Sequence, residues 1–165
     1  MKGTSLKNIK DKIFSIDELE EKVEKWKKNN YKIVFTNGCF DILHLGHIEL
    51  LAKASDLGEK LIIAINSDIS IKNLKGEKRP ILDENSRSII IASLEKVSAV
   101  LIFNELTPLN AIKKINPDLI VKGGDYKKED VIGKNHIEQY GGEVIILPLS
   151  EGFSTTNIFE KIYNG

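Results

Sequence analysis

Residues 33–47 read IVFTNGCFDILHLGH, and this stretch decides how the chain folds. It begins with three apolar residues (33–35), passes through the small polar turn TNG (36–38) and ends in HLGH (44–47). After it, apolar residues recur with a helical period. The pattern predicts a strand, a tight turn and a helix with two histidines at its start. Because the first N–H groups of a helix have no partner within the helix and point outward, the arrangement favours phosphate binding.

Size and composition limit the classes of protein to which the chain can belong. Its 165 residues suffice for one domain with a real core, and 24 basic and 24 acidic side chains give a formal net charge of zero. A general nucleic-acid binder usually carries a basic surplus, so we expect no nucleic-acid partner, although a pocket could still hold one nucleotide. The single cysteine, Cys39, excludes an internal disulfide and fits a cytoplasmic protein. No run approaches the roughly 20 apolar residues of a membrane span, and residues 1–14 lack the apolar core of a signal peptide, so we expect no membrane association.

Short apolar runs alternate with helical periods along the rest of the chain. We divide the chain into an N-terminal extension with a helix (1–30) and a main domain (31–165). Strands are predicted near 31–35 and at 60–66, 99–103, 118–122 and 143–147; helices are predicted at about 16–29, 45–57, 84–96, 107–116, 128–140 and 156–163. Gly58 is expected as the left-handed glycine that ends the second of these helices, and Pro108 is expected in the first turn of a later one. This order predicts an α/β fold, a doubly wound parallel five-stranded sheet with helices on both faces.

Polar clusters follow four of the five predicted strands. They lie at 36–47, 66–79, 122–125 and 150–156. Ligands of doubly wound sheets bind beyond the carboxyl ends of the strands, at a switch point in the strand order. We therefore expect all four clusters to contribute to one site.

His44 and His47 lie three residues apart at a helix start and can face the same point. A zinc site is one alternative, but no third histidine or cysteine has suitable spacing and His136 is distant in the sequence, so we expect no metal held by the protein alone. A structural pair bonded to backbone carbonyls is a second alternative. The position after a glycine turn favours phosphate contact, in which an imidazole donates to a non-bridging oxygen or a leaving phosphate.

Two neighbours of the histidines leave alternatives open. Asp41 either closes a turn, or orients a histidine, or holds Mg²⁺ through water. Cys39 is interpreted as a small packing residue and not as a nucleophile, because no general base is paired with it in the sequence.

A basic stretch follows the second strand. Lys72, Lys75, Lys78 and Arg79 either belong to a solvated loop or form a clamp that closes over a triphosphate. Because 74–80 lacks an apolar period, we predict a mobile surface loop there. Arg87 opens the next helix, and both an exposed surface role and phosphate binding remain open for it.

Two further clusters admit a plain and a functional interpretation. Lys122-Gly123-Gly124-Asp125 is either a turn or a place where a base or ribose approaches the backbone, with Asp125 accepting from a hydroxyl or amino group. Ser154-Thr155-Thr156 either caps the last helix or forms a second phosphate cradle. The chain contains no G-x-x-x-x-G-K-[ST], and no G-x-G-x-x-G follows its first strand, so P-loop and dinucleotide-binding proteins are disfavoured.

At these residues the chain resembles a known family. GCFDILHLGH (38–47), together with Ser154-Thr155-Thr156 near the end, resembles the cytidylyltransferase-like nucleotidyltransferases and their HxGH signature. Within that superfamily the chain is most similar to the heptose 1-phosphate adenylyltransferases, which in many bacteria form the C-terminal half of a bifunctional ADP-heptose synthase. The stretches that carry this similarity are FTNGCFD (35–41), NSD (66–68), LKGE (74–77), RP (79–80), KGGDY (122–126) and STTNI (154–158). No kinase half accompanies them, so we expect a stand-alone form.

The resemblance implies a Rossmann-like HxGH nucleotidyltransferase fold and transfer of AMP from ATP to a sugar 1-phosphate, expected to be D-glycero-D-manno-heptose 1-phosphate. An in-line attack on the α-phosphorus gives ADP-sugar and pyrophosphate, with catalysis by positioning and charge stabilisation. We assign catalytic roles to His44, His47 and Lys75. The expected nucleotide-binding residues are Thr36, Asn37, Gly38, Cys39, Phe40, Asp41, Lys122, Gly123, Gly124, Asp125, Ser154, Thr155 and Thr156. The expected phosphate- or substrate-binding residues are Asn66, Asp68, Lys72, Arg79 and Arg87.

The same resemblance implies Mg²⁺ held mainly by the ATP phosphates and water, and a homodimer. Two other functions stay open. The first is CTP-dependent transfer to an alcohol phosphate such as glycerol 3-phosphate; the match at 122–126 counts against it, and so does the lack, just before Gly152, of the basic residue that such relatives carry. The second is a non-catalytic nucleotide-binding module, against which the retained histidine pair counts.

Overall fold

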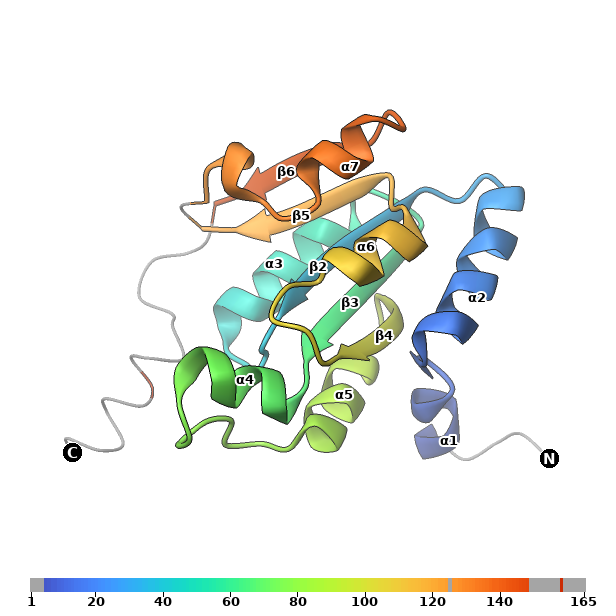
Figure 1. Cartoon of the computed structure of the whole chain (residues 1–165). Coiled ribbons are helices and arrows are strands. Elements are labelled where there is room, and N and C mark those ends of the chain that lie inside the picture. The colour runs from blue at the N-terminus through green and yellow to red at the C-terminus, as the bar shows by residue number, and fades with distance from the viewer. Residues whose placement is uncertain (1–4, 125, 149–157, 159–165) are drawn as a thin grey trace.

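The fold is a six-stranded, all-parallel sheet with helices on both faces (Figure 1). The computed structural model describes residues 5–124, 126–148 and 158. The strands are β1 (Ile13–Phe14), β2 (Ile33–Gly38), β3 (Lys60–Asn66), β4 (Val97–Phe103), β5 (Leu119–Gly123) and β6 (Glu143–Leu147). The helices are α1 (Ser5–Lys10), α2 (Ile16–Lys28), α3 (Leu45–Ser55), α4 (Asp68–Lys75), α5 (Glu84–Ala92), α6 (Leu109–Ile115), α7 (Lys134–Glu138) and the 3₁₀ turn η1 (Lys128–Asp130).

Strand β2 lies at the switch point of the sheet. The order is β1-β4-β3-β2-β5-β6, so the chain runs outward from β2 through β3 to β4 and then returns to the other side of β2 with β5. The register from Ile33↔Lys60 to Gly38↔Ile65 keeps the carboxyl ends of β2 and β3 level. The doubly wound parallel arrangement is confirmed, and it gathers the segments after β2, β3 and β5 at one edge.

The strand count corrects the prediction of five. Ile13 pairs with Val100 and Phe14 with Leu101, which adds β1 beside β4 at the edge of the sheet. A strand of two residues is too short to show a period of its own, and its pairing with β4 defines it. The N-terminal extension therefore contributes to the same sheet as the rest of the chain.

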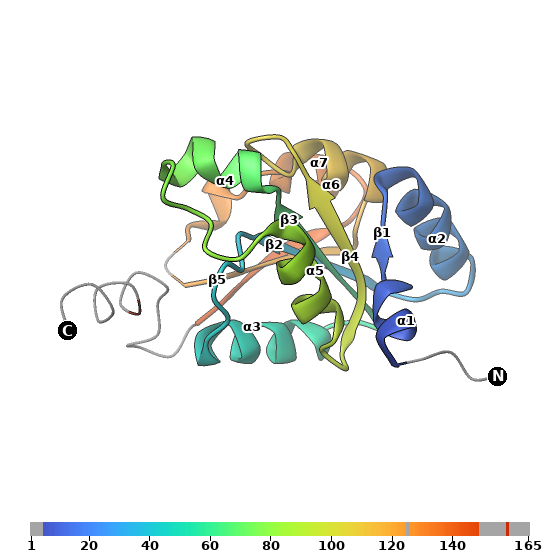
Figure 2. The same cartoon turned by 90° about the horizontal axis from the view of Figure 1, so that it is seen from below.

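The apolar core lies in two layers, one on each face of the sheet (Figure 2). Helices α2, α6 and α7 contribute to the first, where Leu19, Val23 and Trp26 bury the apolar side of α2. Helices α3 and α5 contribute to the second. Their strands are apolar on both faces, as the sequence of β3, KLIIAIN, already indicates.

Several boundaries differ from the predictions for local reasons. Gly58 is not a left-handed cap; a Cβ there would lie 2.8 Å from the Lys32 carbonyl oxygen, so glycine is needed for close approach of two backbone segments. The helix predicted over 128–140 is divided into η1 and α7 because Gly133 adopts a φ of 89° between them. Pro108 is the N-cap of α6 and not part of its first turn.

The remaining differences concern the ends of elements. The helices predicted to end at 57 and 96 end at Ser55 and Ala92, and β4 begins at Val97. The basic stretch 74–80 is not all loop, because Leu74 and Lys75 complete α4. The helix predicted over 156–163 lies outside the described residues apart from 158. Among the helices that the structure describes, none has the length and apolar character needed to cross a bilayer.

Candidate active site

The turn between β2 and α3 forms the centre of the site. His44 is the N-cap of α3 in an extended conformation, and its side chain makes no cap hydrogen bond. The N-cap side chain therefore accepts no hydrogen bond from the first backbone N–H groups of α3, and these groups can bind an anion. Phe40 before it has a φ of 46° and its buried ring lies 5.1 Å from the ring of His47, which supports that imidazole from the core side.

The two histidine rings are stacked on each other. Their centroids lie 3.8 Å apart and their planes differ by 27°. The Nδ1 atom of each ring is buried without a hydrogen-bond partner, so the alternative of a structural pair bonded to backbone carbonyls is wrong for these atoms. Nε2 is the nitrogen that each ring can offer to a ligand.

Burial disfavours the charged form of both imidazoles, and neighbouring groups add to this effect at His47. Burial lowers the pKa of His44. Burial, the neighbouring His44 and the charge of Lys75 lower the pKa of His47 to about 4. A neutral imidazole carries one proton, and at Nδ1 this proton would be buried without an acceptor. With its proton on Nε2, each imidazole is a hydrogen-bond donor toward a ligand.

Helix α4 brings Lys75 to the histidines. Ser67 caps the helix by accepting from the Ser70 N–H, and Gly76 ends it with a φ of 89°. Lys72 and Lys75 lie in its exposed last turn. The Lys75 ammonium contributes to the lowered pKa of His47, so the charge at the end of α4 acts on this imidazole. The catalytic grouping of His44, His47 and Lys75 stays a prediction, which this electrostatic contribution supports.

Asp41 does not orient a histidine. Its carboxylate accepts from Arg79 Nε at 2.7 Å, from the Ile81 N–H at 2.8 Å and from the Leu82 N–H at 2.9 Å, and its side chain is 1% exposed. Burial raises its pKa, but the Leu82 and Ile81 amides and the Arg79 guanidinium outweigh this effect, and the pKa lies below the usual value. Both oxygens are engaged, so neither a histidine contact nor a water-held Mg²⁺ describes its role.

Arg87 is also part of the framework. Its side chain has no exposed surface, so the exposed role is wrong, and a phosphate arriving from solvent cannot reach the guanidinium in this structure. Its donors meet Cys39 O at 2.6 Å, Leu82 O at 2.9 Å and Asp68 Oδ1 at 2.8 Å. Asp68 is correspondingly paired with Arg87.

Asn66 and Cys39 fill the space beneath the turn. The Asn66 side chain donates to Ser70 Oγ at 3.0 Å, and its Oδ1 lies 3.9 Å from Cys39 Sγ. Asn66 is buried and Cys39 is half-buried. The interpretation of Cys39 as a packing residue agrees with these surroundings.

Lys122 joins the ends of β5 and β2. Its ammonium donates to Asn37 Oδ1 at 2.6 Å and Asn37 O at 3.1 Å, and it lies 5.6 Å from the centroid of the Tyr126 ring. Burial lowers its pKa to about 8, with the Cys39 side chain acting in the opposite direction. Thr36 Oγ1, in β2 with Asn37, is buried without a hydrogen-bond partner. Gly124, just after β5, has a φ of 95°. The structure thus brings the 36–38 and 122–124 segments together.

Some expected site residues cannot be placed. Asp125, Ser154, Thr155 and Thr156 lie outside the described residues. Conversely, sequence reasoning missed the backbone of Ile81 and Leu82 as partners of Asp41, and it missed the Phe40 ring against His47. Only three-dimensional proximity connects Asp41 with 79–82, so no local sequence signal could have revealed that contact.

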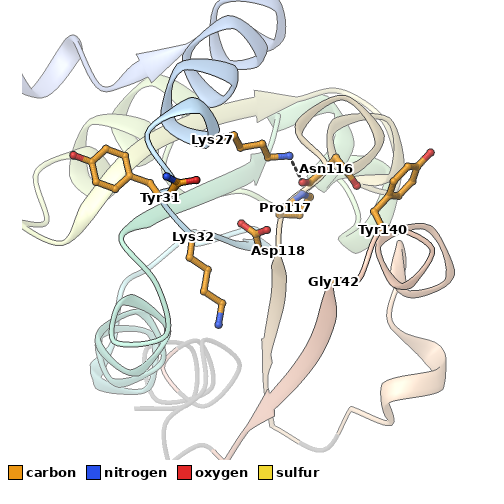
Figure 3. Close-up of a pocket in the computed structure, with 9 residues that line it drawn as sticks. Lys27, Tyr31, Lys32, Asn116, Pro117, Asp118, Tyr140 and Gly142 are labelled. Atoms are coloured by element: carbon orange, nitrogen blue, oxygen red, sulfur yellow. Dashed lines mark hydrogen bonds between the residues drawn. The ribbon is translucent and has the colours of Figure 1, made fainter.

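A separate cleft of about 550 Å³ lies at the opposite, amino end of the strands (Figure 3). Its lining comes from the loops before β2, β5 and β6: Lys27, Asn30, Tyr31, Lys32, Asn116, Pro117, Asp118, Tyr140 and Gly142. Lys27 Nζ donates to the carbonyls of Ile115 and Asn116 at the end of α6, and Asp118 accepts from the Ile33 N–H at 2.6 Å. These contacts join α2, α6 and β2, and the cleft is not part of the histidine site.

Comparison with known proteins identifies the family. The model of the cytidylyltransferase-like family matches residues 35–161. Bifunctional protein HldE of Koribacter versatilis is 49% identical over 91% of this chain, and that of Citrifermentans bemidjiense is 43% identical over 97%. The chain spans about a third of the length of these relatives, 31% and 33%.

Solved structures agree with this assignment. The lipopolysaccharide core biosynthesis protein from Thermoplasma volcanium is 33% identical with a TM-score of 0.60, and the match covers 73% of this chain and 97% of that one. Pantoate-beta-alanine ligase from Francisella tularensis has a TM-score of 0.62 at 15% identity, with 93% and 78% coverage, and this shows the shared fold alone. With its histidine pair at the start of α3 and the family match over most of its length, the chain belongs to the cytidylyltransferase-like family of nucleotidyltransferases.

Proposed function

We propose that this nucleotidyltransferase moves AMP from ATP to a sugar 1-phosphate, specifically D-glycero-D-manno-heptose 1-phosphate, and releases pyrophosphate. The observation that carries the proposal is the stacked His44–His47 pair at the start of α3. The adenylyl group and the sugar are supported by the stretches at 35–41, 74–77 and 122–126 and by the similarity to proteins named HldE.

The proposed chemistry is a single in-line displacement. An oxygen of the sugar phosphate forms a bond to the α-phosphorus of ATP while the bond to the β-phosphate oxygen breaks, and pyrophosphate leaves with that electron pair. The Nε2–H groups of His44 and His47 donate to phosphate oxygens, and Lys75 balances the charge that accumulates on the leaving group. Since the lowered pKa of each imidazole disfavours its charged form, each ring is proposed to donate from Nε2 without giving up its proton.

We propose that the nucleoside lies between the ends of β2 and β5. Lys122 holds Asn37 there, and the glycines 123 and 124 allow a ring to approach the backbone. A phosphate-binding role for Ser154, Thr155 and Thr156 stays a prediction.

Mg²⁺ is proposed to enter with the triphosphate. Among the residues that the structure describes, no group of three or more His, Cys, Asp or Glu side chains is placed to hold a metal. Mg²⁺ commonly keeps several waters and binds through substrate phosphates, which supports this proposal. The homodimer and the cytoplasmic location also stay predictions.

The test is pyrophosphate release by the purified chain. ATP and CTP are each combined with heptose 1-phosphate, other sugar 1-phosphates and glycerol 3-phosphate. We expect turnover with ATP and heptose 1-phosphate. Turnover with CTP and an alcohol phosphate alone would establish the other activity, to which the family description cytidylyltransferase-like points. Nucleotide binding without turnover on any acceptor would indicate a binding module.

A further inference from the structure

Helix α4, which carries Lys72 and Lys75, has little apolar attachment of its own. Only Ser70 and Ile71 are buried among its eight residues, whereas Ile69 is 66% exposed and Leu74 is 50% exposed. A helix held by one apolar side chain depends on polar contacts for its position. Two ion pairs supply such contacts. Asp68, the first residue of α4, pairs with buried Arg87, and Arg79, in the segment after α4, pairs with buried Asp41.

The first ion pair anchors the segment that follows α4. Asp41 lies in the β2–α3 turn, three residues before His44, and it binds Arg79 together with the backbone amides of Ile81 and Leu82. The segment that it holds begins four residues after Lys75. The carboxylate thus connects the chain just beyond the lysine to the turn that carries the histidines.

The second ion pair anchors the start of α4. Arg87 donates to Asp68, the first residue of the helix, and to the carbonyl of Cys39 in the same β2–α3 turn. A third bond to Leu82 O joins this anchor to the first one, because Asp41 accepts from the N–H of the same residue. Both flanks of α4 are therefore fixed to one turn through the buried charges of Asp41 and Arg87, whose partners Arg79 and Asp68 are partly exposed.

We infer that Asp41 and Arg87 are positioning residues that hold Lys75 at a set place relative to His47. Neither residue is placed in contact with the reacting groups; both act through α4. The inference rests on the proposed function for its link to catalysis, but the bonds that fix both flanks of α4 to the β2–α3 turn are present without any substrate.

The inference predicts that removing Asp41 and removing Lys75 are not independent. Asp41→Asn keeps the size of the side chain, removes its charge and presents an N–H₂ group to the loop donors. We expect it to lower kcat by about 10- to 100-fold, the scale of a misplaced catalytic group. In a Lys75→Met background the same change should cost less than about 3-fold, because the residue through which it acts is gone.

A matched control comes from Asp83, a carboxylate in the segment between α4 and α5. Asp83 caps α5 by accepting from the Ser86 N–H and makes no contact with the β2–α3 turn in the described structure. Asp83→Asn should leave kcat within about 2-fold in both backgrounds. A comparable loss of kcat in this control would show that any lost charge in the loop impairs turnover, and would overturn the specific role of Asp41.

A second readout needs no substrate. The chain has three histidines, and their imidazoles can be titrated by NMR in the wild type, Asp41→Asn, Lys75→Met and the double variant. Since the Lys75 charge lowers the pKa of His47, we expect both single variants to raise that pKa and the double variant to raise it no further. A merely structural Asp41 would leave the His47 titration unchanged in the folded variant.

Each outcome decides the inference. Equal losses of kcat in both backgrounds, or a His47 pKa that moves with Lys75→Met but not with Asp41→Asn, would overturn it. If Asp41→Asn does not fold, Arg79→Gln replaces it, because that variant leaves the Asp41 bonds to the Ile81 and Leu82 amides in place. If the wild type shows no adenylyl transfer, the titration still tests the anchoring of Lys75, so the two failures are distinguishable.

Discussion

The two ends of the central strands differ in whether their polar side chains have hydrogen-bond partners. At the carboxyl end, the Nδ1 atoms of His44 and His47 and Thr36 Oγ1 are buried without partners, and Lys72 and Lys75 are exposed. At the amino end, the charges of Lys27 and Asp118 are engaged with backbone groups, and a neutral amide oxygen, Asn116 Oδ1, is the buried atom without a partner. Unpartnered buried polar groups cost stability, so those at the histidines favour a role in ligand contact there.

The comparison separates two kinds of mutational effect. Changes at the histidine site should impair turnover with little effect on stability, whereas changes at the amino end should lower stability and leave the chemistry of the folded fraction intact. A large loss of stability from changes at the histidine site, or a large loss of turnover per folded molecule from changes at the amino end, would contradict this separation.

The largest effect is expected from His47→Ala. Loss of one donor to the transition state should reduce turnover at least about 100-fold, while the thermal unfolding midpoint changes little. Steady-state pyrophosphate release and circular dichroism measure the two quantities. His136→Ala, on α7 away from the site, is the matched control and should retain wild-type turnover. A near-normal rate for His47→Ala would remove the assigned role.

Asp118→Ala tests the amino end. It leaves the buried Ile33 N–H without its acceptor and should lower the free energy of unfolding by about 1–3 kcal/mol. Asp118→Asn retains an acceptor oxygen and should lose less. Denaturant unfolding measures the stability, and turnover per folded molecule should stay near wild type for both variants. A large kcat loss at unchanged stability would contradict the division between the two ends.

The sequence predicted the fold well where local patterns encode it. Runs such as KLIIAIN mark strands buried on both faces, and the capping box Ser15–Glu18 marks the start of α2, where both reciprocal bonds are present. The edge strand β1 escaped prediction because two residues carry no period and their partner, β4, is distant in the sequence. Gly133 was likewise not recognised as the break between η1 and α7.

The site was predictable in part. The gathering of the segments after β2, β3 and β5 at one edge follows from the parallel fold, and the catalytic roles of the histidine pair and Lys75 stay predictions. The ion pairs of Asp41, Arg79 and Arg87 could not be predicted from the sequence. A charged side chain that binds a ligand and one that pairs within the protein have the same sequence signature. The packing around the Arg87 guanidinium, which excludes solvent, decides between these roles and is not visible in one sequence.

The pH dependence of stability sharpens the comparison from the histidine side. The pKa of His47 falls from 6.5 to about 4 on folding, so below pH 6.5 the unfolded chain takes up a proton that the folded chain rejects. The stability linked to this group is thus present above pH 6.5 and lost as the pH falls toward 4. A tenfold change in acidity corresponds to about 1.4 kcal/mol, and partial exposure of the ring reduces the expected loss to about 1–2 kcal/mol. Denaturant unfolding of the wild type and His47→Gln at several pH values isolates the contribution of His47 to the free energy of unfolding. Identical pH profiles of stability for the two proteins would exclude this contribution.

The smallest effect is expected from Lys122→Met, which tests a residue with features of both ends. Lys122 lies at the carboxyl edge, yet its ammonium is engaged with Asn37 in the manner of the amino-end charges. Loss of this contact should loosen the end of β2 and raise the KM for ATP by about 5- to 10-fold, which is close to 1 kcal/mol of binding, with kcat within about 3-fold. Lys122→Arg, which keeps the charge, should lie between wild type and Lys122→Met. A fall in kcat at unchanged KM would show that Lys122 acts on the transition state, as the histidines are proposed to do. A hydrogen-bonded cation at the carboxyl end would then affect turnover directly, and position at one end of the sheet or the other would not by itself separate the two kinds of mutational effect.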